Sequence, residues 1–118
     1  AEIGVISKEV APIKGENVII KNYPNSFVST PLEAQLKAIG IKNLVIAGFM
    51  THMCINSTAR GAFNLGFSPV VVASACASRN LTGANGKVID AQTMHDSALA
   101  ALRDLFAVIV DDVASLKS

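Results

Sequence analysis

Cys54 carries a thiol at the point where a predicted strand passes into a predicted helix. The apolar run over residues 44–47, ended by Gly48, is typical of a parallel strand that is covered on both faces. Cys54 would then lie in the first turn of the next helix, where free backbone N–H groups and the helix dipole favour a thiolate. This position suits a nucleophile, although core packing explains a lone cysteine equally well.

Lys21 is the second candidate, because it ends a predicted short strand over residues 17–21 just before a polar loop. In open parallel α/β sheets the carboxyl ends of the strands border the ligand crevice, so an ammonium group there is placed for chemistry. A solvated lysine at the end of a strand is the alternative. The position of Lys21 alone does not distinguish a catalytic lysine from a solvated one.

The remaining reactive side chains indicate packing rather than a bound cofactor. Cys76 follows another predicted buried strand and is interpreted as a small buried hydrophobe. His52 and His95 lack the spacing of metal ligands, there is no Cys-x-x-Cys pair, and His95 fits a packing or capping role on a helix. Neither glycine-rich nucleotide-binding motif occurs. The sequence predicts no cofactor and no metal within the chain.

The supporting elements alternate between strand and helix. Besides the strand at 17–21, the patterns predict a loop over 1–15, strands over 43–47, 69–74 and 107–110, helices over 51–65 and 87–106, and a helical tail over 113–117. A further helix starts at Thr30-Pro31 with a Thr cap and a Glu33 capping box, and Gly40 ends it. Residues 75–86 form either a lid over a small-molecule pocket or an ordinary loop. The alternation implies right-handed crossovers and a parallel sheet between helix layers.

Composition limits the partners. The chain has 118 residues, of which 51% are hydrophobic, and this is enough for one buried core. A formal charge of +1, a single Tyr and no Trp argue against nucleic-acid binding. No apolar run approaches the roughly 20 residues that cross a bilayer, and no signal-peptide pattern occurs. We therefore expect a cytoplasmic protein with reduced thiols, and no nucleic-acid or membrane partner.

Four motifs in order resemble the isochorismatase-like cysteine hydrolases, a family that includes nicotinamidases and carbamoylsarcosine amidases. The motifs are Glu16-x-Val18-Ile19-x-Lys21, Ser26-Phe27-x-x-Thr30-x-Leu32, Gly48-x-x-Thr51-x-x-Cys54-x-x-x-Thr58-Ala59-Arg60 and Met94-His95-x-x-Ala98-Leu99. The third motif is the most specific, and the four together cover almost the whole chain. The resemblance implies a three-layer α/β/α sandwich with a mostly parallel, Rossmann-like sheet. It matches Lys21 to the family's catalytic lysine and Cys54 to its nucleophile.

The resemblance also implies a mechanism for cleaving the C–N bond of a small amide. The thiolate of Cys54 attacks a carbonyl carbon, and the backbone N–H groups of Met50 and Cys54 bind the oxyanion. A carboxylate oriented by Lys21 moves the proton, and water then hydrolyses the thioester. The family further implies a cis peptide bond between Phe49 and Met50.

One part of the implied site has no counterpart in this sequence. The family's aspartate comes from the first strand, and none of the chain's own aspartates lies in a matching context; they are Asp90, Asp96, Asp104, Asp111 and Asp112. We therefore expect residues 1–118 to form a single hydrolase domain that lacks its first strand or strands. A further segment or a second chain would supply that strand and the acid, and an unpaired sheet edge would favour a homo-oligomer.

Other functions remain open. Hydrolysis of a vinyl ether, as in isochorismate, needs no nucleophilic thiol, so Cys54 favours the amide. A non-catalytic α/β binding or assembly module is the alternative from a different class. A thiol redox protein has the least support, because Cys54 and Cys76 lack the spacing of a resolving pair.

Overall fold

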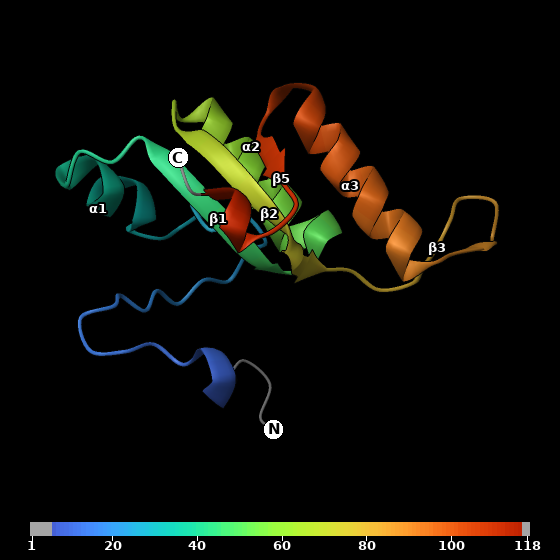
Figure 1. The fold of residues 1–118 in the computed structure, drawn as a ribbon, viewed down its shortest axis with the longest axis horizontal. Helices are drawn as coiled ribbons and strands as arrows, with labels where there is room; N and C mark the ends of the chain where they lie inside the picture. Colours follow the sequence, from blue (N-terminus) through green and yellow to red (C-terminus); the bar gives the residue numbers. More distant parts are fainter. Residues whose placement is uncertain (1–5, 117–118) are drawn as a thin grey trace.

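The computed structural model describes residues 6–116 and has an α/β architecture (Figure 1). In chain order its elements are η1 (Lys8–Val10), α1 (Leu32–Ala38), β1 (Asn43–Phe49), η2 (Thr51–Ile55), α2 (Asn56–Asn64), β2 (Ser68–Ala77), β3 (Leu81–Thr82), β4 (Val88–Ile89), α3 (Ala91–Leu105), β5 (Val108–Val110) and η3 (Val113–Leu116). The elements η1 and η3 are 3₁₀-helices, and η2 is a π-helical turn. The predicted α/β class with a parallel sheet is confirmed.

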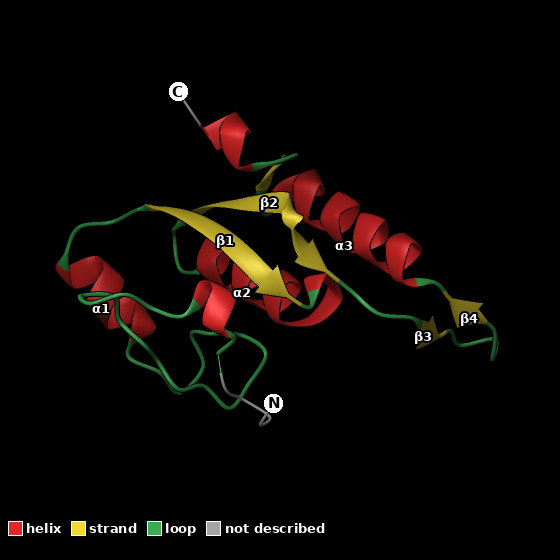
Figure 2. Cartoon of the chain, turned by 60° about the horizontal axis from the view of Figure 1, so that its bottom comes forward, coloured by secondary structure: helices red, strands yellow, loops and turns green. Residues whose placement is uncertain are grey.

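The main sheet has three parallel strands in the order β1-β2-β5. Val45 lies opposite Val70 on β2, and Val70 lies opposite Val108 on β5. The helices α2 and α3 pack against β2 and against each other, and they lie on the same side of the sheet (Figure 2). The core lies in that layer and consists of Ile55, Ala59, Val71, Cys76, Leu99 and Leu102.

The strand β1 is covered on one face only, so the prediction of a strand buried on both faces is wrong. Its burial alternates along the chain, with Leu44 and Ile46 partly buried. On the other face Val45 is 59% exposed and Phe49 is 73% exposed. The apolar run does not alternate in the sequence, because alanine and valine occupy positions that this structure leaves open.

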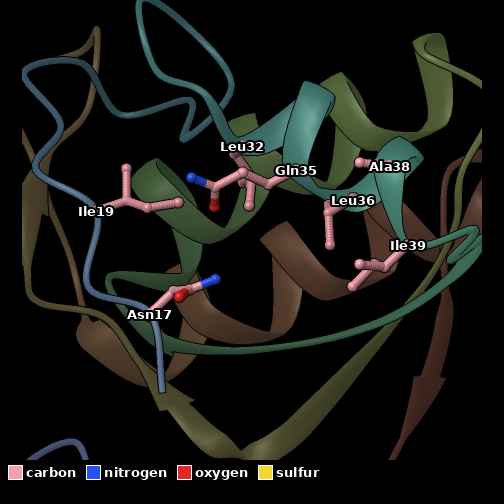
Figure 3. A pocket seen from close by; sticks show the side chains of 7 residues that line it. All are labelled: Asn17, Ile19, Leu32, Gln35, Leu36, Ala38 and Ile39. Carbon is pink, nitrogen blue, oxygen red and sulfur yellow. The ribbon is translucent and has the colours of Figure 1, made fainter. Parts of the chain in front are cut away.

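Residues 17–21 do not form the predicted strand. A strand needs a neighbour for its backbone hydrogen bonds, and the outer edge of β1 is unpaired within residues 6–116. A hollow of about 580 Å³ separates Asn17 and Ile19 from α1 (Figure 3). Val18 and Ile20 are 59% and 84% exposed, so β propensity in this segment is not accompanied by pairing or burial.

Several predicted boundaries also move. The strand β2 continues to Ala77, and the antiparallel hairpin of β3 and β4 begins inside the predicted loop over 75–86 and ends inside the predicted helix over 87–106. Helix α3 begins at Ala91 rather than at residue 87, since Asp90 caps it. At α1 no capping box forms, because Glu33 pairs with Lys37 at 2.6 Å. Parts of the predicted lead over 1–15 and tail over 113–117 lie outside the described residues.

None of the helices within residues 6–116 combines the length and the apolar character that a membrane span needs.

Candidate active site

Cys54 lies in η2, which we call the nucleophile turn, immediately after β1. The peptide bond between Phe49 and Met50 is cis, at the position where the family resemblance implies one. The carbonyl oxygen of Met50 accepts hydrogen bonds from the N–H groups of Met53 (3.0 Å) and Ile55 (3.3 Å). In the described part of the chain, the N–H of Cys54 does not donate to that oxygen. The π-type turn therefore leaves the backbone N–H of Cys54 outside the hydrogen bonds to the Met50 carbonyl. Turns of this type are frequent at functional sites.

The nucleophile turn is held from two neighbouring elements. Thr51 is fully buried, and its Oγ1 lies 2.7 Å from Nδ1 of His95 on α3. The backbone N–H of His52 donates to Oγ of Ser78, just beyond β2, at 3.3 Å, and Nδ1 of His52 lies 3.1 Å from the same oxygen. Ile55 is 5% exposed and belongs to the core. The turn is therefore fixed by polar contacts on one side and by the core on the other.

Lys21 and Cys54 are 33 positions apart in the sequence, and the structure brings their side chains together. Nζ of Lys21 lies 3.4 Å from Sγ of Cys54. The same ammonium donates to the backbone carbonyl oxygens of Tyr23 at 2.9 Å and Pro24 at 3.1 Å. The structure thus places a positively charged group beside the sulfur of the predicted nucleophile.

The segment that carries the lysine, residues 21–27, is attached to α2, and we call it the lysine segment. Thr58 is 8% exposed, and its Oγ1 accepts a hydrogen bond from the N–H of Ser26 at 3.0 Å. The same hydroxyl lies 3.3 Å from the carbonyl oxygen of Pro24. Gly61 leaves room for Asn25, because a Cβ at position 61 would lie 2.6 Å from the Asn25 amide nitrogen.

Phe27 completes this attachment by stacking on Phe67, with ring centroids 5.7 Å apart. No role in the site was predicted for Thr58, Gly61 or Phe27. The available signal was the spacing of Cys54 and Thr58, which places both on neighbouring turns of one helix.

No carboxylate of the described residues pairs with Lys21. The ion pair found within residues 6–116 joins Lys37 to Glu33. Asp90 instead accepts a hydrogen bond from the N–H of Thr93 at 2.7 Å, which lowers the pKa of its carboxyl. Residues 6–116 also contain no group of three or more His, Cys, Asp or Glu side chains that could hold a metal ion. The acid implied by the resemblance therefore has no candidate in this part of the chain.

Cys76, the other free cysteine, is in a different environment. It is 8% exposed within the core, and burial raises the pKa of its thiol, although a backbone hydrogen bond from Gly48 partly opposes this effect. A thiol with a raised pKa stays protonated near neutral pH and is a poor nucleophile. Its interpretation as a small buried residue agrees with the structure.

Residues 4–112 match the family model described as the Isochorismatase domain. The uncharacterised isochorismatase family protein YddQ of Bacillus subtilis is 39% identical over 112 residues, which cover 95% of this chain and 62% of that protein. The crystal structure of an isochorismatase from Pseudomonas putida superposes with a TM-score of 0.90 at 35% identity, covering 97% of this chain and 58% of that one. The chain belongs to the isochorismatase family of hydrolases.

A further relative has a named activity. The ureidoacrylate amidohydrolase RutB of Stutzerimonas stutzeri is 39% identical over 67 residues, which cover 57% of this chain and 27% of that protein. The chain thus spans 62% or less of the length of each of these relatives.

Proposed function

We propose that the protein hydrolyses the C–N bond of a small amide through a covalent thioester on Cys54. The observation that carries the proposal is the 3.4 Å contact between Nζ of Lys21 and Sγ of Cys54 at the start of a helix. Two features typical of reactive cysteines, a neighbouring ammonium group and the first turn of a helix, coincide there. The name of the RutB relative, an amidohydrolase, supports the same reaction class.

The proposed reaction has two stages, formation of a thioester and its hydrolysis. The thiolate forms a C–S bond to the amide carbon, and the carbonyl electron pair moves onto the oxygen. The N–H groups of Met50 and Cys54 are the donors proposed to stabilise that oxyanion. Collapse of the intermediate breaks the C–N bond, and an acid protonates the departing amine. Water then attacks the thioester and releases the carboxylic acid and the free thiol.

We propose that the acid comes from a polypeptide segment that adds a strand to the free edge of β1. The edge is unpaired within the described residues, and Val45 and Phe49 present apolar side chains beside it. The chain's coverage of 58% of the Pseudomonas putida protein also agrees with additional polypeptide in the complete enzyme.

The mass of the native protein tests the source of that segment. An intact mass larger than that of residues 1–118 would identify a longer chain, whereas a second polypeptide or a second copy would appear as a complex under native conditions. A native protein of this mass alone, active on amides, would contradict the proposal.

We also propose a cytoplasmic location and a homo-oligomer. A reducing compartment agrees with the two free cysteines.

Turnover of an amide panel by the complete protein tests the nucleophile. Wild type is compared with Cys54→Ala, and Cys76→Ala serves as the matched control because it removes the other thiol. We expect Cys54→Ala to lose activity by about a thousandfold or more, as removal of a covalent nucleophile does. Equal turnover by wild type and Cys54→Ala would remove the thiol from the mechanism.

A non-catalytic module is the second candidate, and the lack of an ion pair at Lys21 within residues 6–116 favours it. Iodoacetamide labelling separates the two candidates. A catalytic thiol at position 54 should react much faster than Cys76 near neutral pH, because burial raises the pKa of Cys76. Equal, slow labelling of both cysteines would favour the module.

A further inference from the structure

Thr58 connects the two reactive side chains of the candidate site. It lies on α2, which continues directly from the nucleophile turn, so Thr58 and Cys54 belong to one rigid stretch of helix. Its side chain is nine-tenths buried and faces the lysine segment. The Thr58 hydroxyl lies within hydrogen-bond distance of Ser26 N, Ser26 Oγ and the carbonyl oxygen of Pro24.

The contact with Pro24 matters because Lys21 uses the same oxygen. Nζ of Lys21 donates to the Pro24 carbonyl at 3.1 Å, and Oγ1 of Thr58 lies 3.3 Å from it. A carbonyl oxygen has two lone pairs and can accept from both donors. The position of this oxygen relative to α2 therefore determines where the ammonium sits, and Thr58 provides the contact from α2.

The Thr58 hydroxyl oxygen also accepts a hydrogen bond, and this contact fixes Ser26. Its oxygen accepts the hydrogen bond from the N–H of Ser26 at 3.0 Å, so one side chain holds both Pro24 and Ser26. Lys21 itself is exposed, and no ion pair holds it within the described residues. Its long side chain would otherwise sample many rotamers.

We propose that Thr58 is a positioning residue that holds the Lys21 ammonium against the sulfur of Cys54. This inference rests on the proposed function, because it gives the sulfur the role of nucleophile. Thr58 does not touch the reacting atoms. It acts through the Pro24 carbonyl and the lysine, and its loss lowers the reactivity of Cys54 only while Lys21 is present.

The test measures the rate at which iodoacetamide labels Cys54 in the complete protein near neutral pH, with the site located by peptide mass. The variants are Thr58→Val, which keeps the shape, Thr58→Ser, which keeps the hydroxyl, Lys21→Met, and the double variant Lys21→Met with Thr58→Val. Ser57→Ala on the same turn is the control. Thermal melting reports whether each variant is folded, and Thr58→Ala replaces Thr58→Val if the latter is not.

We expect Thr58→Val to slow labelling on the order of three- to tenfold, since it removes the hydrogen bonds that hold the segment. Thr58→Ser and Ser57→Ala should stay within about twofold of wild type. Lys21→Met should slow labelling at least as much as Thr58→Val, and the double variant should equal Lys21→Met alone.

Three results would overturn the inference. They are a wild-type rate in Thr58→Val, a further slowing of Lys21→Met by Thr58→Val, and a wild-type rate in Lys21→Met. Labelling does not depend on amide turnover. A failure of the inference is therefore distinct from a failure of the proposed function, which is decided by the activity of Cys54→Ala.

Discussion

The two halves of the candidate site are held in different ways. The nucleophile turn rests on the core through Ile55 and is bonded to His95 on α3 and to Ser78 beyond β2. The lysine segment lies outside the sheet and is attached mainly to α2, through Thr58 and Asn25. One half is therefore built into the fold, whereas the other is a surface segment whose geometry depends on few contacts. We expect substitutions in the lysine segment to lower the reactivity of Cys54 with little loss of stability. Substitutions in the nucleophile turn should lower both.

The largest effect on stability should come from the core beneath the nucleophile turn. Leu102 is fully buried on α3, so Leu102→Ala leaves a cavity and should lower the free energy of unfolding by about 2–5 kcal/mol. Urea denaturation followed by circular dichroism measures this. A loss below 1 kcal/mol, on the order of a surface substitution, would show that the core is less continuous than the contacts indicate.

The hydrogen bond between Thr51 and His95 should matter next. Thr51→Val keeps the shape and removes the hydroxyl, so the turn loses its contact with α3. We expect turnover to fall by about ten- to a hundredfold, because small displacements of reacting groups are costly. Thr51→Ser, which keeps the hydroxyl, is the matched control. Unchanged turnover in Thr51→Val would mean that the turn is positioned without α3.

The stacked rings of Phe27 and Phe67 test the other half. Phe27→Leu should cost about 0.5–1.5 kcal/mol of stability, the typical contribution of an aromatic pair beyond its buried area. The rate of Cys54 labelling should nevertheless fall, because the lysine segment loses part of its attachment. If labelling and stability change in proportion, the segment unfolds with the core and the contrast between the halves is wrong.

The smallest effect is expected at the start of α3. The carboxylate of Asp90 caps this helix, and the hydrogen bond from Thr93 lowers its pKa below the usual value. Because the pKa of Asp90 is lower in the folded state than its usual value, the charged cap stabilises the fold at pH values above the usual carboxyl pKa. This stabilisation is lost as the pH falls through the folded-state pKa. The melting temperature of Asp90→Ala should thus lie slightly below that of wild type near neutral pH. The difference should shrink in acid, and a constant difference would argue against the charged cap.

Much of the fold could be predicted because its signals are local. Gly66 ends the helix after Cys54, β-branched residues form β2, and the patterns of α3 and β5 are clear within short windows. The segment at 17–21 has the same kind of signal, yet a strand also requires a neighbour, which the sequence of the segment does not reveal. The short β3–β4 hairpin was missed because two-residue strands have no periodicity.

The candidate site was predictable only in part for a related reason. Lys21 and Cys54 could be named from motifs, and their proximity follows from the family resemblance. The contacts that hold them to the rest of the fold join residues 26–44 positions apart, such as His52 with Ser78 and Thr51 with His95. Such pairs leave no pattern in a single sequence, since each hydroxyl or imidazole looks like an ordinary helix residue until the fold brings its partner close.

Gly61 provides a way to adjust the site without changing either reacting group. Any side chain at this position would displace the Asn25 side chain, because even a methyl group would meet its amide nitrogen at 2.6 Å. A graded series from alanine to serine to valine would therefore test whether displacing the Asn25 side chain changes the separation between ammonium and sulfur. The dependence of thiol reactivity on that separation could then be measured within one scaffold.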